Sequence, residues 1–244
     1  MFNKSIFLII TFIFHTLSLS SQIVNVDSKR QSEEKGLSGI TEFTFDFNKS
    51  VQTDWEFSNI TYLQWDNEKW SVLILNETNL DRAAGIDFSN DGYQHLRVSK
   101  HLNKIYTLES YLQNQYDPVR DIKNRKLAGL GVRVKFIKSC FLGLSTFYEK
   151  EEITNETIND IRINSALQIK FDFGKKLSLS TTMYYQPSTK KFKDSKSSNE
   201  TILLINLNDR LSISNTLSIN YDTNPAKNIP NLIYSFENGL VYSF

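Results

Sequence analysis

Two histidines in the body of the chain, His95 and His101, are the residues best suited to metal binding or acid–base chemistry. They lie six positions apart in the run HLRVSKH, in which polar and apolar residues alternate. On an extended strand this spacing puts both rings on one face but about 20 Å apart, at about 3.3 Å per residue, which is too far for one metal ion. We therefore expect no metal site, and nothing in the sequence indicates a cofactor.

A serine activated by a histidine is the other chemistry to consider, because lipid hydrolases use such pairs. Ser99 shares the face of His95 but lies four positions away, at roughly 13 Å, so the two side chains cannot pair within one strand. Cys140 is the only cysteine, and with no histidine near it in sequence it is best explained as an apolar filler. We predict no catalytic residue and keep a lipid hydrolase as the third functional alternative.

Long polar side chains at alternate positions of strand-like runs are the stronger functional candidates. Facing one another across neighbouring strands, Glu109 and either Arg97 or Arg133 can form ion pairs. Inside a barrel, such residues either satisfy one another and hold the lumen closed or form a narrow selective passage. The eight lumen-lining candidates are His95, Arg97, Glu109, Gln113, Arg133, Lys135, Arg162 and Lys170.

Strands must position these residues, and the alternation of residue types is the evidence for strands. From 161 to 173, apolar residues such as Ile163 and Phe171 occupy one face, and polar residues such as Arg162 and Lys170 occupy the other. A helix would scatter both sets around its circumference. Twelve runs of this kind follow one another, at 36–47, 51–65, 68–80, 92–102, 105–116, 126–136, 140–148, 161–173, 177–186, 200–208, 211–221 and 232–244.

The links between the runs alternate in length, which is typical of barrels with short periplasmic turns and longer outer loops. All four prolines fall in the long links, where no ladder hydrogen bond is lost. The long links are 81–91, 117–125, 149–160, 187–199 and 222–231. We predict an all-β fold, a single antiparallel transmembrane β-barrel of about 12 strands that spans residues 36–244.

A soluble β-sandwich or lipocalin-like barrel is the alternative fold, in which the aromatic residues would pack inside. Aromatics form 13% of the chain, and rings such as Trp65 and Tyr148 stand near strand ends, which suits a membrane interface. The soluble alternative explains neither the alternating link lengths nor the C-terminal strand. We therefore favour the membrane barrel.

Both ends of the chain carry export features. Lys4 precedes an apolar run at 6–17 and small residues at Ser20 and Ser21, which predicts a cleaved signal peptide at 1–21 and a short periplasmic segment at 22–35. At the C-terminus, alternation continues to the last residue, so the final strand is expected to pair with the first. Leu240, Tyr242 and Phe244 are the predicted closure residues and insertion signal.

Charge indicates which partners to expect. Without the signal peptide the chain has 27 basic and 27 acidic residues, so we expect no nucleic-acid partner, which would need a basic surface. The expected partners are outer-membrane lipid, lipopolysaccharide and, during insertion, the barrel assembly machinery. One long link looks acidic (Glu149, Glu151, Glu152, Glu156 and Asp160), and the next looks basic (Lys190, Lys191, Lys193 and Lys196). Both are best explained as solvated loops, and contact of the lysine loop with anionic lipopolysaccharide is the alternative.

The stretch from 90 to 136 resembles domain-of-unknown-function family 481, which includes proteins called salt-induced outer-membrane proteins. The resemblance lies in His95-Leu96-Arg97, in Leu102-Asn103-Lys104, in Glu109 with Tyr111 and Gln113, and in Arg125 followed by the segment 127–133. It implies an outer-membrane barrel and supplies no catalytic residues. The function expected from the sequence is an envelope-supporting or stress-related barrel with a charged, largely occluded lumen. The alternative is a narrow diffusion channel for small polar solutes.

Overall fold

The computed structural model describes residues 35–49, 53–83, 86–118, 121–137, 139–174, 176–208, 211–226 and 229–242. The predicted signal peptide, nearly all of the predicted periplasmic segment, and Phe244 lie outside these ranges. Within them, no helix has the length and apolar character that would let it cross a membrane.

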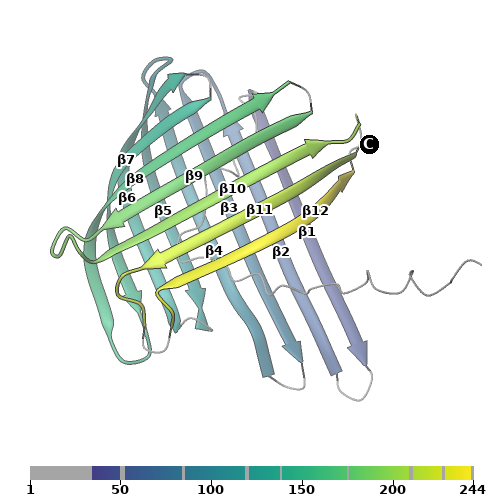
Figure 1. Ribbon diagram of the computed structural model, residues 1–244. Helices are drawn as coiled ribbons and strands as arrows, with labels where there is room; N and C mark the ends of the chain where they lie inside the picture. The colour runs from purple at the N-terminus through teal and green to yellow at the C-terminus, as the bar shows by residue number, and fades with distance from the viewer. Residues whose placement is uncertain are drawn as a thin grey trace, which may run out of the picture.

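Twelve strands form one sheet in which each strand pairs antiparallel with its neighbours in sequence (Figure 1). This confirms the predicted all-β, antiparallel fold. The strands are β1 Gly36–Lys49, β2 Thr53–Asp66, β3 Trp70–Ala83, β4 Ile86–His101, β5 Tyr106–Asp117, β6 Ile122–Ile137, β7 Cys140–Glu152, β8 Thr157–Phe173, β9 Leu177–Pro187, β10 Ser195–Asn206, β11 Leu211–Asp222 and β12 Leu232–Tyr242.

Residue alternation sorts the side chains onto two faces of this sheet. On β8, Arg162 and Ala166 are buried, whereas their neighbours Ile161 and Ile163 are exposed. On β6, Leu130 is 67% exposed, and Arg125 is 1% exposed. Large apolar residues therefore face outward and many charged residues face inward, as a lipid-facing barrel with a polar interior requires.

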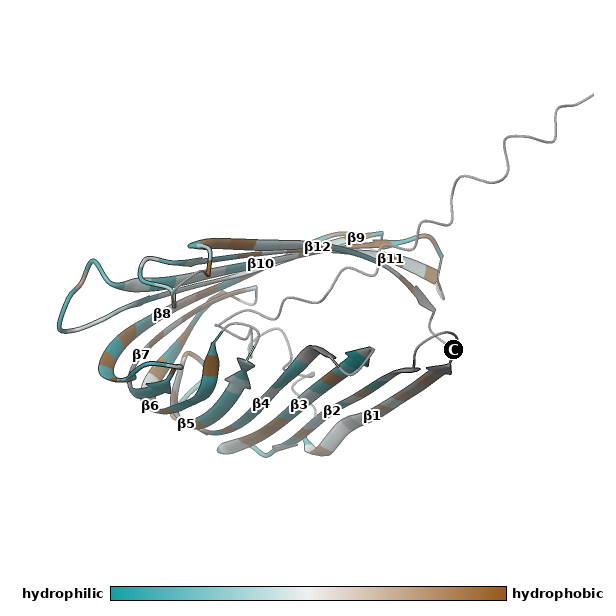
Figure 2. Cartoon of the chain, turned by 90° about the horizontal axis from the view of Figure 1, so that it is seen from below, coloured by the Kyte–Doolittle hydropathy of each residue, from teal (hydrophilic) through white to brown (hydrophobic). Residues whose placement is uncertain are grey.

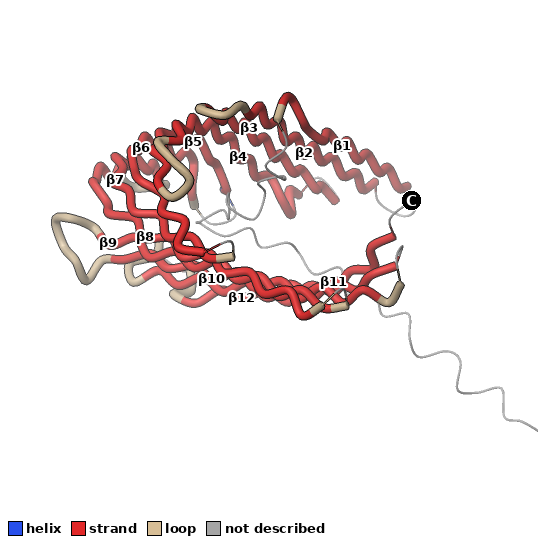
Figure 3. The backbone as a smooth tube through the Cα atoms, turned by 90° about the horizontal axis from the view of Figure 1, so that it is seen from above, coloured by secondary structure: helices blue, strands red, loops and turns tan. Residues whose placement is uncertain are grey.

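The sheet curves back on itself, so β1–β5 and β9–β12 form two walls joined by a bend at β6–β8 (Figures 2 and 3). The predicted pairing of the last run with the first is not found, since β1 and β12 form the two edges of the sheet in the described residues. Pairing needs nearly aligned strands about 4.8 Å apart, whereas β1 and β12 run in different directions (Figure 1). Leu240 is exposed on β12, and the role of this strand in insertion stays a prediction.

The outer loops are shorter than the sequence predicts. Strands β3, β4, β6, β7, β8 and β10 extend into the predicted long links, and the connection between β7 and β8 shrinks to residues 153–156. Beyond the strand segments with large apolar residues on the outward face, the residues are polar but the backbone pairing of the strands continues. These residues therefore form strand although their composition is that of a loop. Glu149 and Glu151 of the predicted acidic loop and Lys196 of the predicted basic loop are consequently buried strand residues.

A glycine on β6 makes room for one of the central side chains of the interior. Gly129 pairs with Tyr111 of β5, and a Cβ atom at Gly129 would lie 2.3 Å from the Tyr111 ring. The ring covers the bare glycine backbone, a packing that stabilises glycines in sheets. The Tyr111 hydroxyl thereby reaches Ser145 of β7 at 3.3 Å, which links three strands across the inward face.

Candidate functional site in the lumen wall

Five charged side chains meet on the inward face of the bend, and we call them the ionic cluster: Arg125, Glu149, Glu151, Arg162 and Lys196. They come from β6, β7, β8 and β10. Glu149 lies at the centre, with Arg125 Nε 2.6 Å from Oε1 and Arg162 Nε 2.6 Å from Oε2. Lys196 Nζ lies 2.6 Å from Glu151 and 3.5 Å from Glu149. The curvature of the sheet brings β10 within reach of β7.

Burial makes the pairing within this cluster essential. The side chains of Arg125 and Glu149 are each 1% exposed. Taking a charge out of water costs several kcal/mol, which only a closely placed opposite charge with good hydrogen bonds offsets. Glu149 meets this condition by accepting hydrogen bonds from two guanidinium groups and an ammonium group. Removing this carboxylate would deprive three cations of the partner that they share.

Arg162 also ties the cluster to the connection between β9 and β10. Its Nη2 donates to Asp194 Oδ1 at 2.9 Å, and its Nη1 donates to the Gln186 carbonyl at 3.1 Å. Pro187, which has no backbone N–H to donate, stands at the end of β9. The guanidinium of Arg162 therefore holds this connection against β8 close to Pro187, where a backbone hydrogen-bond donor is missing.

A second group of polar residues lies on β4 and β5. Arg97 Nε donates to His95 Nε2 at 3.3 Å. Because the arginine nitrogen can only donate, this contact favours the imidazole tautomer that carries its proton on Nδ1. Nδ1 lies 3.1 Å from the Tyr93 hydroxyl, which donates to Gln113 Oε1 at 3.2 Å. The neighbours of the histidine thus favour a single tautomer.

Stacking reinforces this arrangement. The His95 ring lies between those of Tyr93 and Tyr111, with centroid distances of 5.9 and 5.7 Å. The Arg97 guanidinium lies 5.5 Å from the centre of the Tyr111 ring, and its Nη1 is 3.3 Å from Glu109. These contacts realise the ion pair between Arg97 and Glu109 that the sequence predicted as one of two possibilities.

Basic residues line the wall nearer the β6–β7 turn. Arg133 lies over the Phe141 ring at 4.4 Å from its centroid and donates to Gln168 at 2.8 Å. Lys135 lies over the same ring at 5.5 Å. Lys170 is placed apart from the others, since it is largely exposed and 3.6 Å from Asp172.

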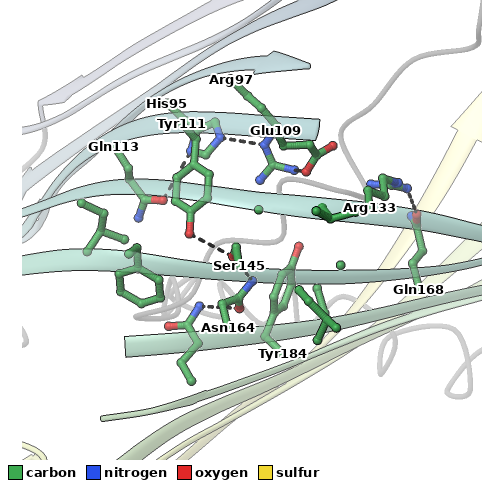
Figure 4. Close-up of a pocket in the computed structure, with 18 of the residues that line it drawn as sticks. His95, Arg97, Glu109, Tyr111, Gln113, Arg133, Ser145, Asn164, Gln168 and Tyr184 are labelled. Carbon is green, nitrogen blue, oxygen red and sulfur yellow. Dashed lines mark hydrogen bonds and ion pairs between the residues drawn. The ribbon is translucent and has the colours of Figure 1, made fainter. Parts of the chain in front are cut away.

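A cavity of about 60 Å³ lies between these groups (Figure 4). A single water needs at least about 10–15 Å³ of such space, so the cavity holds only a few water-sized groups. Of the predicted lumen residues, His95, Arg97, Glu109, Gln113 and Arg133 line it. The inner wall is therefore polar, charged and closely packed.

Sequence reasoning brought His95, Arg97, Glu109 and Arg162 to this wall but missed most of the ionic cluster. The sequence pattern predicts that Arg125 ends a long link and that Glu149, Glu151 and Lys196 lie within long links. The available signal was the two-residue period: Arg125 is in phase with Arg133 on β6, and Glu149 is in phase with Phe147 on β7. Following that phase beyond the apolar outer residues places Arg125, Glu149 and Glu151 on the inward face.

Among the described residues, no three His, Cys, Asp or Glu side chains form a group that can hold a metal ion. His95 is 3% exposed and faces the lumen, whereas a lipid hydrolase needs its histidine on the lipid side near the outer rim.

Residues 41–244 match the family described as protein of unknown function, DUF481. The chain belongs to this family. No functionally curated protein matches the sequence. Among solved structures, the NanC porin is similar in fold, with a TM-score of 0.51 and 9% identity over 85% of this chain and 98% of that one. The KdgM porin, solved in complex with disordered oligogalacturonate, gives 0.43 and 10% over 84% and 99%. This family member therefore has a barrel-like, porin-type fold.

Proposed function

We propose that this chain is a narrow diffusion channel of the outer membrane that admits small polar solutes. The observation that supports it most directly is the division of the sheet into an apolar outer face and a charged inner face. A passage for water and solutes needs polar walls, and a porin-type fold supplies the frame for them. The proposal thus favours the second of the two functions expected from the sequence.

The ionic cluster sets the size and selectivity of this channel. Arg125, Glu149 and Arg162 project inward from the bend, and Lys196 meets them from β10, so the cluster narrows the lumen at this point. Because the charges are paired, the wall carries little net charge and selects by size more than by sign. Rearrangement of the cluster would widen the passage.

An envelope-supporting barrel with an occluded lumen is the second candidate. The close mutual pairing around Glu149 and the small cavity favour it, because both would also arise if the charges only held the strands together. The two candidates predict opposite electrical behaviour.

Location and partners belong to the same proposal. Export through a cleaved signal peptide, insertion by the barrel assembly machinery, and contact with outer-membrane lipid and lipopolysaccharide all agree with the apolar outer face. Lys190, Lys191 and Lys193 lie in the connection between β9 and β10 and are the residues that would meet lipopolysaccharide.

Conductance of the purified, folded protein in a planar lipid bilayer tests the proposal. We expect discrete current steps well below those of a 16-stranded porin measured alongside. Glu149→Gln is expected to change the step size, whereas Asp172→Asn, a charge change outside the cluster, is expected to leave it unaltered. Absence of steps above a detergent control, in protein shown to be folded by heat-modifiable gel mobility, would exclude the channel and favour the occluded barrel.

A further inference from the structure

A hollow in the lumen wall next to the ionic cluster has the composition of a sugar-binding site. Its floor is made of small inward-facing residues on adjacent strands, where Gly131 pairs with Ser145 and Gly143 pairs with Ala166. These residues line the cavity described above (Figure 4). We infer that this hollow binds a neutral polyhydroxylated solute, a small sugar or sugar alcohol. The inference deepens the proposed function, on which it depends for the route by which the solute arrives.

Aromatic rings bracket the small residues. Along the inward face of β7 the order is Phe141, Gly143, Ser145 and Phe147. One ring therefore stands at each end of the two small residues. At about 3.3 Å per residue the two phenylalanines are about 20 Å apart along the strand. Tyr184 of β9 lines the cavity beside them. Arg133 and Lys135 lie over the Phe141 ring and Phe147 is buried, so Tyr184 is the ring placed to offer an apolar face to the C–H groups of a sugar. Binding sites typically combine such faces with a few placed polar groups.

Amide side chains supply the polar groups. Asn164 donates to the Ser145 hydroxyl at 3.1 Å, and Gln186 donates to Asn164 Oδ1 at 3.1 Å. The other atom of the Gln186 amide, Oε1, is buried and has no hydrogen-bond partner in the described structure. A buried acceptor without a donor is costly, so this oxygen calls for a group that donates from within the cavity. A hydroxyl is such a donor.

The charges around the hollow favour a neutral ligand over an anion. Of the three arginines that line the hollow, Arg97 is paired with Glu109 at 3.3 Å and Arg125 with Glu149 at 2.6 Å, while Arg133 donates to the Gln168 amide at 2.8 Å. Amide groups both donate and accept, as hydroxyl groups do, which matches a ligand that carries several hydroxyls. With room for only a few water-sized groups, the cavity takes the hydroxyls on one edge of a sugar ring, while the rest of the ring stays in the lumen.

Two variants test the hollow without disturbing the ionic cluster. A Cβ atom at Gly143 would meet Ala166 Cβ at 3.4 Å and Ala166 O at 3.9 Å, which are ordinary contacts, so Gly143→Leu fills the cavity without a backbone clash. Gln186→Leu removes the unpartnered oxygen. Ala128→Leu is the matched control, because Ala128 is exposed, next to Gly129, and on the outward face of β6.

The measurement is saturation-transfer NMR of D-glucose with the folded full-length protein in detergent. We expect a glucose signal from the wild-type protein and from Ala128→Leu, and binding at least about tenfold weaker in both cavity variants, as the loss of one or two hydrogen bonds implies. No glucose signal from the wild-type protein, or equal signals from the wild-type protein and Gly143→Leu, would overturn the inference. A signal from glucuronate but not from glucose would overturn the neutral class. Glucose binding without conductance would refute the channel and leave the binding site standing.

Discussion

Replacing Glu149 by glutamine removes one negative charge from the centre of the ionic cluster while keeping the size of the side chain. The carboxylate lies 2.6 Å from Arg125 Nε, 2.6 Å from Arg162 Nε and 3.5 Å from Lys196 Nζ, and its side chain is 1% exposed. Without it, three buried cations lose their common partner. Glu151 is left to Arg125 and Lys196, and Asp194 is left to Arg162. Breaking a buried pair in this way typically costs about 3–5 kcal/mol. We therefore expect Glu149→Gln to be destabilised by about that amount.

Urea unfolding of the protein in lipid vesicles, followed by tryptophan fluorescence, measures this loss as a free energy. Asp172→Asn is the control, because the pair of Asp172 with Lys170 is exposed at 3.6 Å and exposed pairs contribute little. The double variant of Arg125→Gln and Glu149→Gln is expected to recover part of the loss, since it removes one of the opposed cations. A loss below about 1 kcal/mol for Glu149→Gln would refute the reasoning, because it would mean that water or rearrangement replaces the carboxylate at small cost.

Three further changes test other parts of the structure. Gly129→Ala places a methyl group 2.3 Å from the Tyr111 ring and is expected to cost about 1–3 kcal/mol of unfolding free energy; adding Tyr111→Ala should relieve that strain, and a cost unchanged by the second substitution would contradict the packing described. Leu130→Arg puts a charge on the lipid face and is expected to cost about 2–4 kcal/mol near the bilayer centre, whereas Lys126→Arg, an exposed residue on the same face, should change little; equal stabilities would argue against lipid contact. Replacing Lys190, Lys191 and Lys193 with glutamine is expected to weaken binding to lipopolysaccharide vesicles, and unchanged binding would rule out that contact.

The fold followed from the sequence because the two-residue period is strong where lipid faces one side. From Ile161 to Phe173, and from Ala128 to Phe136, apolar and polar residues alternate so regularly that strand, face and order could all be assigned. Toward the outer ends of the strands the outward-facing residues are no longer apolar. Polar residues then occupy both faces, so the alternation of apolar and polar residues disappears. Such a pattern resembles a solvated loop, which is why the buried positions of Glu149 and Lys196 were missed.

The arrangement of the site required information that a linear sequence does not carry. The pair of Arg97 with Glu109 could be predicted because the two residues lie on consecutive strands. The alternation of residues along each strand puts both side chains on the inward face. The contact between Lys196 and Glu151 joins β10 to β7, and it exists because the sheet bends between them (Figure 3). Curvature depends on the whole set of side chains within the bend, so no local pattern predicts it.

The single carboxylate of Glu149 makes the assembly of four strands interdependent. Until β10 arrives, Lys196 is absent, and Glu151 lacks its closest partner, at 2.6 Å, and keeps only Arg125 at 3.4 Å. A buried charge without its closest partner is costly, so a partly assembled sheet that stops at β8 or β9 is disfavoured. Strands β6 to β10 are therefore expected to enter the bilayer as one unit, with the cluster formed before its surroundings lose their water.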